Sequence, residues 1–312
     1  MYKIIFFGTS AFAVPSLKAL AEDGRFEIAA VITRADKPVG RHAEVTPPAI
    51  KVSAESLGIA VQQPETLKDE AFGAWLKEIG PTCDAFVVVS YGKILPSWIL
   101  ELPKQGIVNV HGSLLPRWRG PSPIQSAIAE GDSMTGVTIM KINEKMDQGP
   151  ILSTEETHIA PNETGGQLHD RLAKLGAQVL PFVLAGYLDG KVKPHEQDHS
   201  LATTCKILTR EDGKINWAEE GYAIARKVLA YNPWPGTWTM FGDKRLKILK
   251  ADVLDGDPNF KPGKAYALDG RPCVATKNGV GLELVEIQME GKKPMAGQDF
   301  LKGQKDWENA QF

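Results

Sequence analysis

The sequence lacks several patterns that would assign it at once to a class of metal-binding or covalent enzymes. Its three cysteines, Cys83, Cys205 and Cys273, lie far apart and form no CxxC pair, which argues against a disulfide framework or a cysteine zinc site. The six histidines form no HExxH sequence, and no GxSxG sequence marks an activated nucleophile. We therefore expect neither a bound metal ion nor a covalent intermediate on the protein.

Long apolar runs and an excess of charge of either sign are also lacking. The opening apolar stretch, residues 4–7, is far shorter than the roughly 18 residues that a membrane-spanning helix needs. The 36 basic and 38 acidic residues give a formal net charge of −2, without the basic excess typical of bulk nucleic-acid binders. We expect a cytoplasmic monomer with no membrane partner.

The composition and the patterning predict a folded chain of two domains. Of the 312 residues, 43% are apolar and 24% are charged, as in globular proteins. Short apolar segments alternate with segments of helical periodicity, which favours an α/β fold, a Rossmann-like parallel sheet with helices on both faces. The predicted strands cover residues 3–7, 27–33, 85–90, 107–110 and 137–142, and the predicted helices cover 14–22, 47–56, 67–79, 122–129 and 165–188.

The turn after the first predicted strand does not favour dinucleotide binding. Gly8 lacks the second and third glycines of a GxGxxG sequence. The second strand ends in Thr33 and Arg34, where a ribose-binding acidic residue would be expected. These features argue against an oxidoreductase that uses NAD or FAD.

The sequence changes in character after the long predicted helix. Residues 190–207 are polar and contain Pro194, so we assign them as a linker between domains at 1–189 and 208–312. Asn216 and Glu219 resemble a capping box at the start of a helix over 217–229. Short β-rich segments with frequent turns follow, and they predict a small OB-like β-barrel.

Two polar residues stand at the end of an apolar strand. Because side chains alternate along a strand, Asn109 and His111 share one face, and Val108 and Val110 share the other. Open α/β sheets bind ligands at the carboxyl ends of their strands. An amide that stabilises an oxyanion and an imidazole that moves protons suit acyl transfer. The alternative is a polar strand end that caps the following loop.

An acidic residue, Asp147, follows the next predicted strand. If that strand neighbours the strand of Asn109 and His111, Asp147 reaches the same rim and can hydrogen-bond to His111. The alternative is an aspartate in an ordinary turn before Gly149. Sequence spacing leaves both interpretations open.

Further motifs accompany these residues along almost the whole chain, and together they resemble the folate-dependent formyltransferases. The motifs in the carboxyl-terminal part are similar to those of the branch that acts on methionyl-tRNA. The resemblance is carried by residues 109–120, 123–125, 135–140, 146–149, 232–235 and 291–295.

The resemblance implies the substrates and a set of site residues. The donor is 10-formyltetrahydrofolate, a co-substrate, and the acceptor is the α-amine of initiator methionyl-tRNA. The implied catalytic residues are Asn109, His111 and Asp147. The implied folate-binding residues are Val89, Ser90, Tyr91, Gly92, Ser113, Leu114, Leu115 and Pro116.

The resemblance also implies tRNA contacts at Lys37, Arg41 and Lys206. Residues 1–205 carry a formal charge of −4 and residues 206–312 carry +2, so we expect few placed cations and a modest dependence of tRNA binding on salt. One alternative is a sugar-nucleotide N-formyltransferase with the same donor. Another is a folate- or RNA-binding protein without catalytic activity.

Overall fold

The computed structural model describes residues 1–39, 44–277 and 279–312, and the chain divides into two compact units. The first unit comprises Met1–Pro123, Met134–His158 and His169–Cys205. The second unit comprises Ile124–Ser133, Ile159–Leu168 and Lys206–Phe312. Each unit is therefore assembled from segments that are separated in the sequence.

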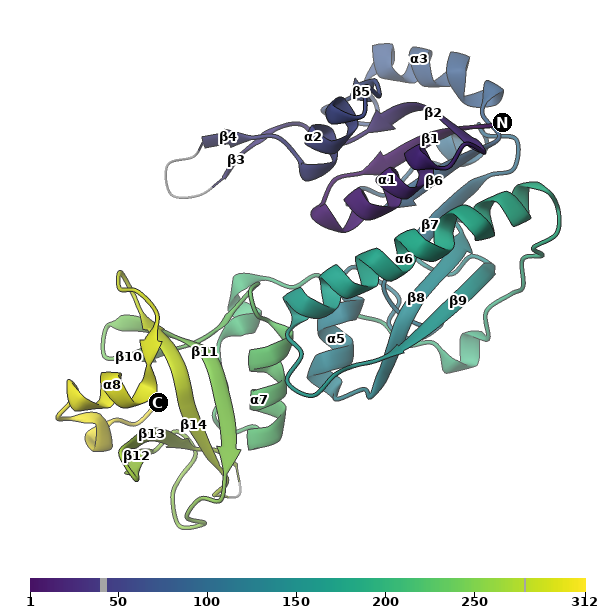
Figure 1. Ribbon diagram of the computed structural model, residues 1–312. Coiled ribbons are helices and arrows are strands. Elements are labelled where there is room, and N and C mark those ends of the chain that lie inside the picture. The colour runs from purple at the N-terminus through teal and green to yellow at the C-terminus, as the bar shows by residue number, and fades with distance from the viewer. Residues whose placement is uncertain (40–43, 278) are drawn as a thin grey trace. The chain divides into compact units, whose positions relative to one another are not determined.

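A seven-stranded sheet forms the centre of the first unit, in the order β5-β2-β1-β6-β7-β8-β9 (Figure 1). The first five strands in this order pair in parallel, and β8 and β9 pair antiparallel. The α/β class with a mainly parallel, Rossmann-like sheet is thus confirmed. The strands are β1 (Tyr2–Gly8), β2 (Phe26–Ile32), β5 (Val61–Gln62), β6 (Ala85–Val89), β7 (Ile107–His111), β8 (Met134–Lys141) and β9 (Ile151–His158).

The prediction of a parallel sheet is wrong at β8, which runs antiparallel to β7, and the sheet continues in a further antiparallel strand, β9. The connection between these two strands, residues 142–150, is too short for a crossover helix, so they form a hairpin. The sequence analysis missed β9 because half of its side chains are exposed and only its first two are buried, so it lacks the apolar pattern of a buried strand.

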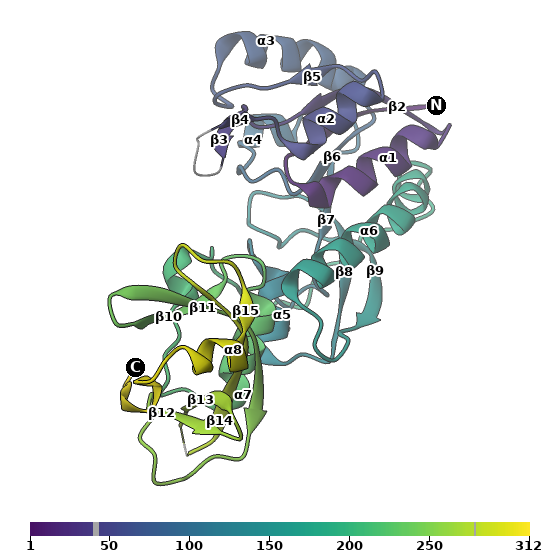
Figure 2. The ribbon, with the colours of Figure 1, turned by 60° about the vertical axis from the view of Figure 1, so that its left-hand side comes forward.

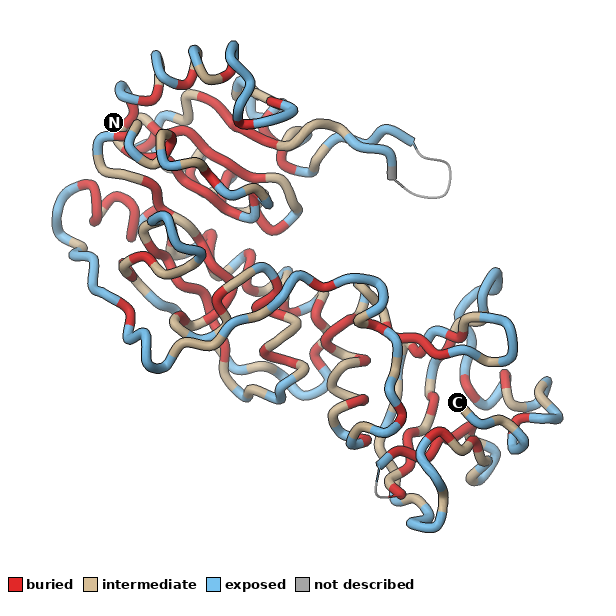
Figure 3. The backbone as a smooth tube through the Cα atoms, turned by 180° about the vertical axis from the view of Figure 1, so that it is seen from behind, coloured by how far each residue is buried: buried red, intermediate tan, exposed pale blue. Residues whose placement is uncertain are grey.

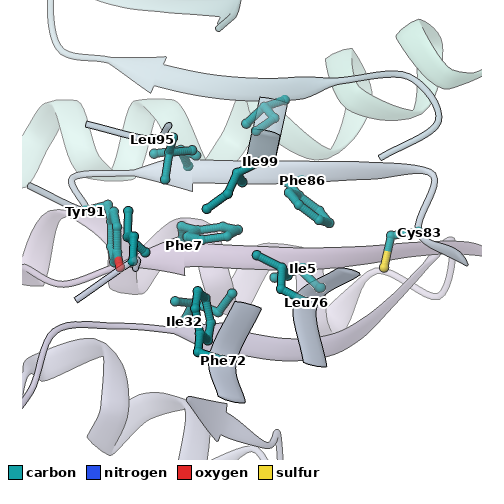
Figure 4. Close-up of a cluster of buried hydrophobic side chains, with 13 residues drawn as sticks. Ile5, Phe7, Ile32, Phe72, Leu76, Cys83, Phe86, Tyr91, Leu95 and Ile99 are labelled. Carbon is teal, nitrogen blue, oxygen red and sulfur yellow. The ribbon is translucent and has the colours of Figure 1, made fainter. Parts of the chain in front are cut away.

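Helices cover both faces of this sheet. Phe72 and Leu76 of α3 pack with Ile5, Phe7 and Phe86 in a buried cluster on one face (Figure 4). Val110 of β7 contacts Gly176 of α6 on the other face. The helices of this unit are α1 (Val14–Glu22), α2 (Ala49–Ser56), α3 (Glu70–Ile79), α4 (Ser97–Leu100) and, from His169 onward, α6 (Gly165–Leu188), whereas α5 (Pro123–Glu130) falls almost wholly in the second unit. A two-stranded hairpin is formed by β3 (Lys37–Val39) and β4 (Glu44–Thr46).

The second unit contains an antiparallel sheet in the order β10-β11-β14-β13-β12, with β15 paired to β14 (Figure 2). Within residues 206–277 and 279–312, no ladder joins β10 to β12, so the sheet is open between these strands. Its strands are β10 (Thr237–Phe241), β11 (Lys244–Leu254), β12 (Ala265–Leu268), β13 (Arg271–Ala275), β14 (Gly281–Met289) and β15 (Met295–Ala296). Helices α7 (Gly221–Ala230) and α8 (Gly297–Lys302) lie in the same part of the chain, and nearly all of α5 also belongs to this unit.

Helix α7 begins later than the sequence analysis predicts. Asn216 does not cap it, because the helix starts at Gly221 with Glu220 as the N-cap residue. The Asn216 Oδ1 accepts a hydrogen bond from the Ala218 N–H, which makes a local turn before the helix. Trp217, buried against the sheet, occupies this turn.

Residues 189–205 pack onto the first unit along part of their length. His195 and Ile151 exchange two backbone hydrogen bonds, and Arg119 forms a bridge with Thr204. Gln197 is buried, while the residues around it are exposed. Figure 3 shows buried positions concentrated in the strands of the central sheet and exposed positions in the connecting segments. In the described part of the chain, no helix has both the length and the apolar character needed to cross a membrane.

Candidate active site

Strand β7 places Asn109 and His111 on the same face of the sheet. Val110, between them, contacts α6 on the opposite face. Asn109 pairs with Val88 of β6, and His111 pairs with Thr138 of β8. Within the described residues, the Asn109 side chain makes no hydrogen bond, so its amide donor is available to a ligand.

The His111 ring is buried, with 7% of the side chain exposed, and both of its nitrogens face oxygen atoms. Nε2 lies 2.9 Å from the carbonyl oxygen of Trp118, which can only accept a hydrogen bond, so Nε2 carries the hydrogen. Nδ1 lies 3.7 Å from Oδ2 of Asp147, beyond hydrogen-bonding distance. Within the described residues, Nδ1 is therefore the ring nitrogen without a close hydrogen-bond partner.

Asp147 reaches His111 by a route different from the one expected. Because β8 runs antiparallel to β7, the end of β8 at Lys141 lies beside Val108, near the start of β7. The loop that follows must return along β7 to bring Asp147 to His111. Asp147 has a left-handed backbone with φ of 52°, and its carboxylate accepts a hydrogen bond of 2.8 Å from the Gly120 N–H.

The predicted folate-binding residues 89–92 lie at the carboxyl end of β6, beside the end of β7. Ser90 has a left-handed backbone, and its hydroxyl accepts a hydrogen bond of 2.7 Å from Ser10. Tyr91 is buried, and burial raises its pKa to about 12. Within the described chain its hydroxyl has no hydrogen-bond partner. Val89 ends the strand, and Gly92 continues the turn with φ of 78°.

The second predicted folate-binding segment, residues 113–116, is a turn held by hydrogen bonds. The Ser113 hydroxyl donates to the carbonyl oxygen of Arg117 at 2.6 Å, and the Leu115 N–H donates to the Thr138 hydroxyl at 3.0 Å. Leu115 packs in a buried cluster with Met140 and Ile151. Because Ser113 and Leu115 point into the protein, Leu114, Pro116 and the backbone remain for contact with a ligand.

The structure places the predicted tRNA-binding cations in different parts of the fold. Lys37 is exposed at the start of β3. Lys206 lies in the second unit and forms an ion pair with Asp212, whose pKa falls to about 2 because Lys206 and Thr209 donate hydrogen bonds to it. Arg41 lies outside the described residues.

Two further cations, Arg34 and Lys93, lie near Lys37, and the sequence analysis assigned neither of them to the tRNA contacts. A side chain at Gly92 would meet Arg34 at 3.3 Å, so Arg34 lies beside the turn after β6. Lys93 donates to the carbonyl oxygen of Glu65 at 2.9 Å. Burial, and then the charges of Arg34 and Lys37, lower the pKa of Lys93. Arg34, Lys37 and Lys93 therefore bring positive charge together in the segments that follow β2 and β6.

Two family patterns match the chain, and between them they cover both units in large part. The pattern described as formyl transferase matches residues 2–184. The pattern described as the formyl transferase C-terminal domain matches residues 207–305. Asn109, His111 and Asp147 all lie within the first match.

Individual proteins are similar over almost the full chain. The methionyl-tRNA formyltransferase of Acidobacterium capsulatum is 42% identical over 302 residues, which cover 96% of each chain. That of Myxococcus xanthus is 42% identical over 304 residues, covering 97% of this chain and 95% of its own. Among solved structures, an N-formyltransferase from Helicobacter canadensis, in complex with folinic acid and dTDP-3-aminofucose, has a TM-score of 0.66 at 18% identity and covers 91% of this chain and 99% of its own. The last similarity shows the fold alone.

Proposed function

This chain belongs to the formyl transferase family, and from that membership we propose how its site works. The chain transfers the formyl group of 10-formyltetrahydrofolate to the α-amine of methionyl-tRNA. The observation that carries this function is the 42% identity to methionyl-tRNA formyltransferases over 96% of the chain. We propose that the acceptor is the initiator species, and that the protein acts as a cytoplasmic monomer, since one chain supplies every residue placed in the site.

The reaction replaces one carbon–nitrogen bond with another. The free α-amine of the methionyl group attacks the formyl carbon, and a tetrahedral centre with a negatively charged oxygen forms. The bond from this carbon to N10 of the folate then breaks. The attacking nitrogen loses one proton, and N10 gains one, so the charge balances.

We assign the three polar residues of the site to this sequence of events. The Asn109 amide has no partner in the described chain, so it can donate a hydrogen bond to the developing oxyanion. His111 transfers the proton through Nδ1, directly or through a water molecule, because Nε2 is held by Trp118. The Asp147 carboxylate, 3.7 Å from Nδ1, supplies a negative charge opposite the positive charge that the ring carries during the proton transfer.

The residues that surround the site are compatible with a folate. The left-handed turn at Ser90 and the hydrogen-bonded turn at Ser113 lie after adjacent strands, so the backbone of both turns can contact the pterin. The buried Tyr91 hydroxyl is an unused polar group close to the first turn. We propose that Val89–Gly92 and Ser113–Pro116 form the folate pocket.

We propose that cations on both units contact the tRNA. Lys37, Arg41 and Lys206 are the candidates, and residues 206–312 carry a formal charge of +2. The antiparallel sheet of the second unit is compatible with an OB-like fold, which in other proteins is a partly open barrel that binds oligonucleotides. Lys206 would have to leave or share Asp212 in order to bind a phosphate.

A parallel assay of two acceptors tests the substrate. The protein is incubated with 10-formyltetrahydrofolate and either charged initiator methionyl-tRNA or dTDP-3-aminofucose. We expect formylmethionyl-tRNA and no formylated sugar. Turnover of the sugar alone would favour a sugar-nucleotide N-formyltransferase.

The His111→Ala variant tests the catalytic assignment. We expect kcat to fall about 10²- to 10⁴-fold, the range for a general acid–base residue, with tRNA binding retained. His195→Ala is the matched control, since that side chain is exposed and its contact with Ile151 is through the backbone. Near-normal turnover in His111→Ala would show that the ring has only a structural role.

A further inference from the structure

Gln197 is a buried polar residue that the proposed mechanism does not use. It comes from the segment after α6, where His195 pairs with Ile151 at the start of β9. The side chain is only 5% exposed, although the residues on either side of it are exposed. It is inserted between the loop that carries Asp147 and the turn that follows β7.

The Gln197 amide uses its full hydrogen-bonding capacity at this position. Its Nε2 donates to the backbone carbonyl oxygens of Asp147 at 2.9 Å and of Gly149 at 2.8 Å. Its Oε1 accepts two hydrogen bonds from Arg119, from Nε at 3.1 Å and from Nη2 at 2.7 Å. If the amide were flipped, its NH2 group would face the Arg119 guanidinium and its oxygen would face two carbonyl oxygens. The hydrogen bonds therefore fix the orientation of the amide.

Asp147 needs such support because of its backbone. Its φ of 52° is in the left-handed region, which is unfavourable for a residue with a side chain. The two hydrogen bonds from Gln197 hold the carbonyl groups on either side of Gln148 and thus define the turn. The Asp147 carboxylate can then accept the hydrogen bond from Gly120 and lie 3.7 Å from His111.

Arg119 connects the other end of the same amide to His111. The Arg119 side chain is 6% exposed, and its backbone exchanges hydrogen bonds with Thr203 and Cys205. It follows Trp118, whose carbonyl oxygen lies 2.9 Å from Nε2 of His111. The amide of Gln197 therefore connects two segments that face His111. One segment, through Trp118, contacts Nε2 of the ring, and the other carries the Asp147 carboxylate, which faces Nδ1.

We propose that Gln197 is a positioning residue, which sets the distance and the orientation of the Asp147 carboxylate relative to His111. The inference rests on the proposed function, since it assigns Gln197 an effect through Asp147. Displacement of a catalytic group by about 1 Å is enough to lower a rate on the order of 10²-fold. Gln197 itself does not need to contact either substrate.

A double-mutant cycle tests this proposal. The kcat and KM values for formylation of methionyl-tRNA are measured for the wild type, Gln197→Met, Asp147→Asn and the double variant. Met has a similar size and lacks the amide. We expect kcat of Gln197→Met to fall about 10- to 100-fold, with both KM values within about twofold of the wild type. In the Asp147→Asn background, we expect the same change to alter kcat by less than about twofold.

Two further variants separate positioning from general loss of stability. Gln197→Glu keeps an acceptor for Arg119 but places a carboxylate oxygen against the carbonyl oxygens of Asp147 and Gly149, so we expect its kcat to fall. This variant therefore tests the proposal even if the Gln197→Met protein does not fold. Gln105→Met is the matched control, because Gln105 donates one hydrogen bond to the carbonyl oxygen of Leu188, away from Asp147. We expect its kcat to stay within about twofold of the wild type.

The outcomes distinguish this inference from the proposed function. Losses of kcat that multiply in the double variant, or a wild-type kcat in both Gln197→Met and Gln197→Glu, would overturn the role of Gln197. A wild-type kcat in Asp147→Asn would instead overturn the proposed role of Asp147, and with it the positioning effect. A wild-type protein that does not formylate methionyl-tRNA would contradict the substrate assignment itself.

Discussion

The carboxylate of Asp147 and the ring of His111 face one another across 3.7 Å, although 35 residues of sequence separate them. The same carboxylate oxygen accepts the Gly120 N–H at 2.8 Å, so it is held in place without a close contact to the ring. In the mechanism that we propose, Nδ1 of His111 is the ring nitrogen that takes the proton, directly from the reacting amine or through water.

The Asp147→Asn substitution removes the charge and preserves the shape of the loop. Asn adopts the left-handed region more readily than most residues, so the turn at φ of 52° should persist. We expect the midpoint of thermal unfolding to change little, and kcat to fall by about 10²-fold. Steady-state formylation assays and a thermal scan measure the two effects. A large drop in the unfolding midpoint would mean that the charge supports the fold.

The Asn109→Asp substitution removes the proposed oxyanion donor at nearly constant size. Loss of one such donor lowers kcat by about 10²- to 10³-fold in other enzymes, and we expect a similar effect here. The KM for the folate should change little, because the donor acts on the charge that develops during the reaction. A variant with an unchanged kcat and a raised folate KM would show that Asn109 binds the donor in its ground state only.

The Tyr91→Phe substitution tests the buried hydroxyl beside the predicted folate pocket. This hydroxyl has no partner within the described residues, and an unpaired buried hydroxyl costs on the order of 1 kcal/mol or more. We therefore expect the free energy of unfolding of Tyr91→Phe to rise by about 1 kcal/mol in urea titrations. A fall of similar size would show that the hydroxyl is hydrogen-bonded in solution.

Acid should weaken the second unit through Asp212. The pKa of Asp212 is about 2 in the folded chain, against an ordinary value of 3.8, because Lys206 and Thr209 donate to the carboxylate. A lowered carboxyl pKa stabilises the fold above pH 3.8, and this stabilisation is lost as the pH falls toward 2.

The Asp212→Asn variant measures this contribution. Between pH 5 and pH 2.5, the wild type should lose about 1 kcal/mol more unfolding free energy than the variant, since solvent screens the ion pair. Urea titrations at the two pH values provide the comparison. Equal losses in both proteins would show that other carboxylates account for the acid sensitivity.

The sequence allowed prediction of features that depend on local periodicity. The alternation of side chains along residues 107–111 predicted that Asn109 and His111 share one face of the strand. The structure agrees, because Val110, between them, packs on α6 at the opposite face. The helices at Val14–Glu22 and Gly165–Leu188 have the predicted bounds, because apolar residues repeat along them at helical spacing.

Features that depend on pairing between distant segments were not predictable in the same way. The direction of β8 is set by its ladders with β7 and β9, and neither leaves a periodic signal in the sequence. The proximity of Asp147 to His111 was expected from parallel neighbours, whereas it depends on a loop that returns along β7. Gln197 was assigned to a linker because its polar neighbours gave no sign of burial.

The hydrogen bonds of Gln197 also affect when the site is completed during synthesis. Asn109, His111 and Asp147 leave the ribosome well before residue 197, and the chain grows from its N-terminus. A nascent chain that ends at residue 189 contains all three side chains and the whole of the seven-stranded sheet. It lacks the amide that holds the Asp147 turn, so the nascent chain should gain the geometry that we propose for catalysis only after the segment that follows α6 has emerged.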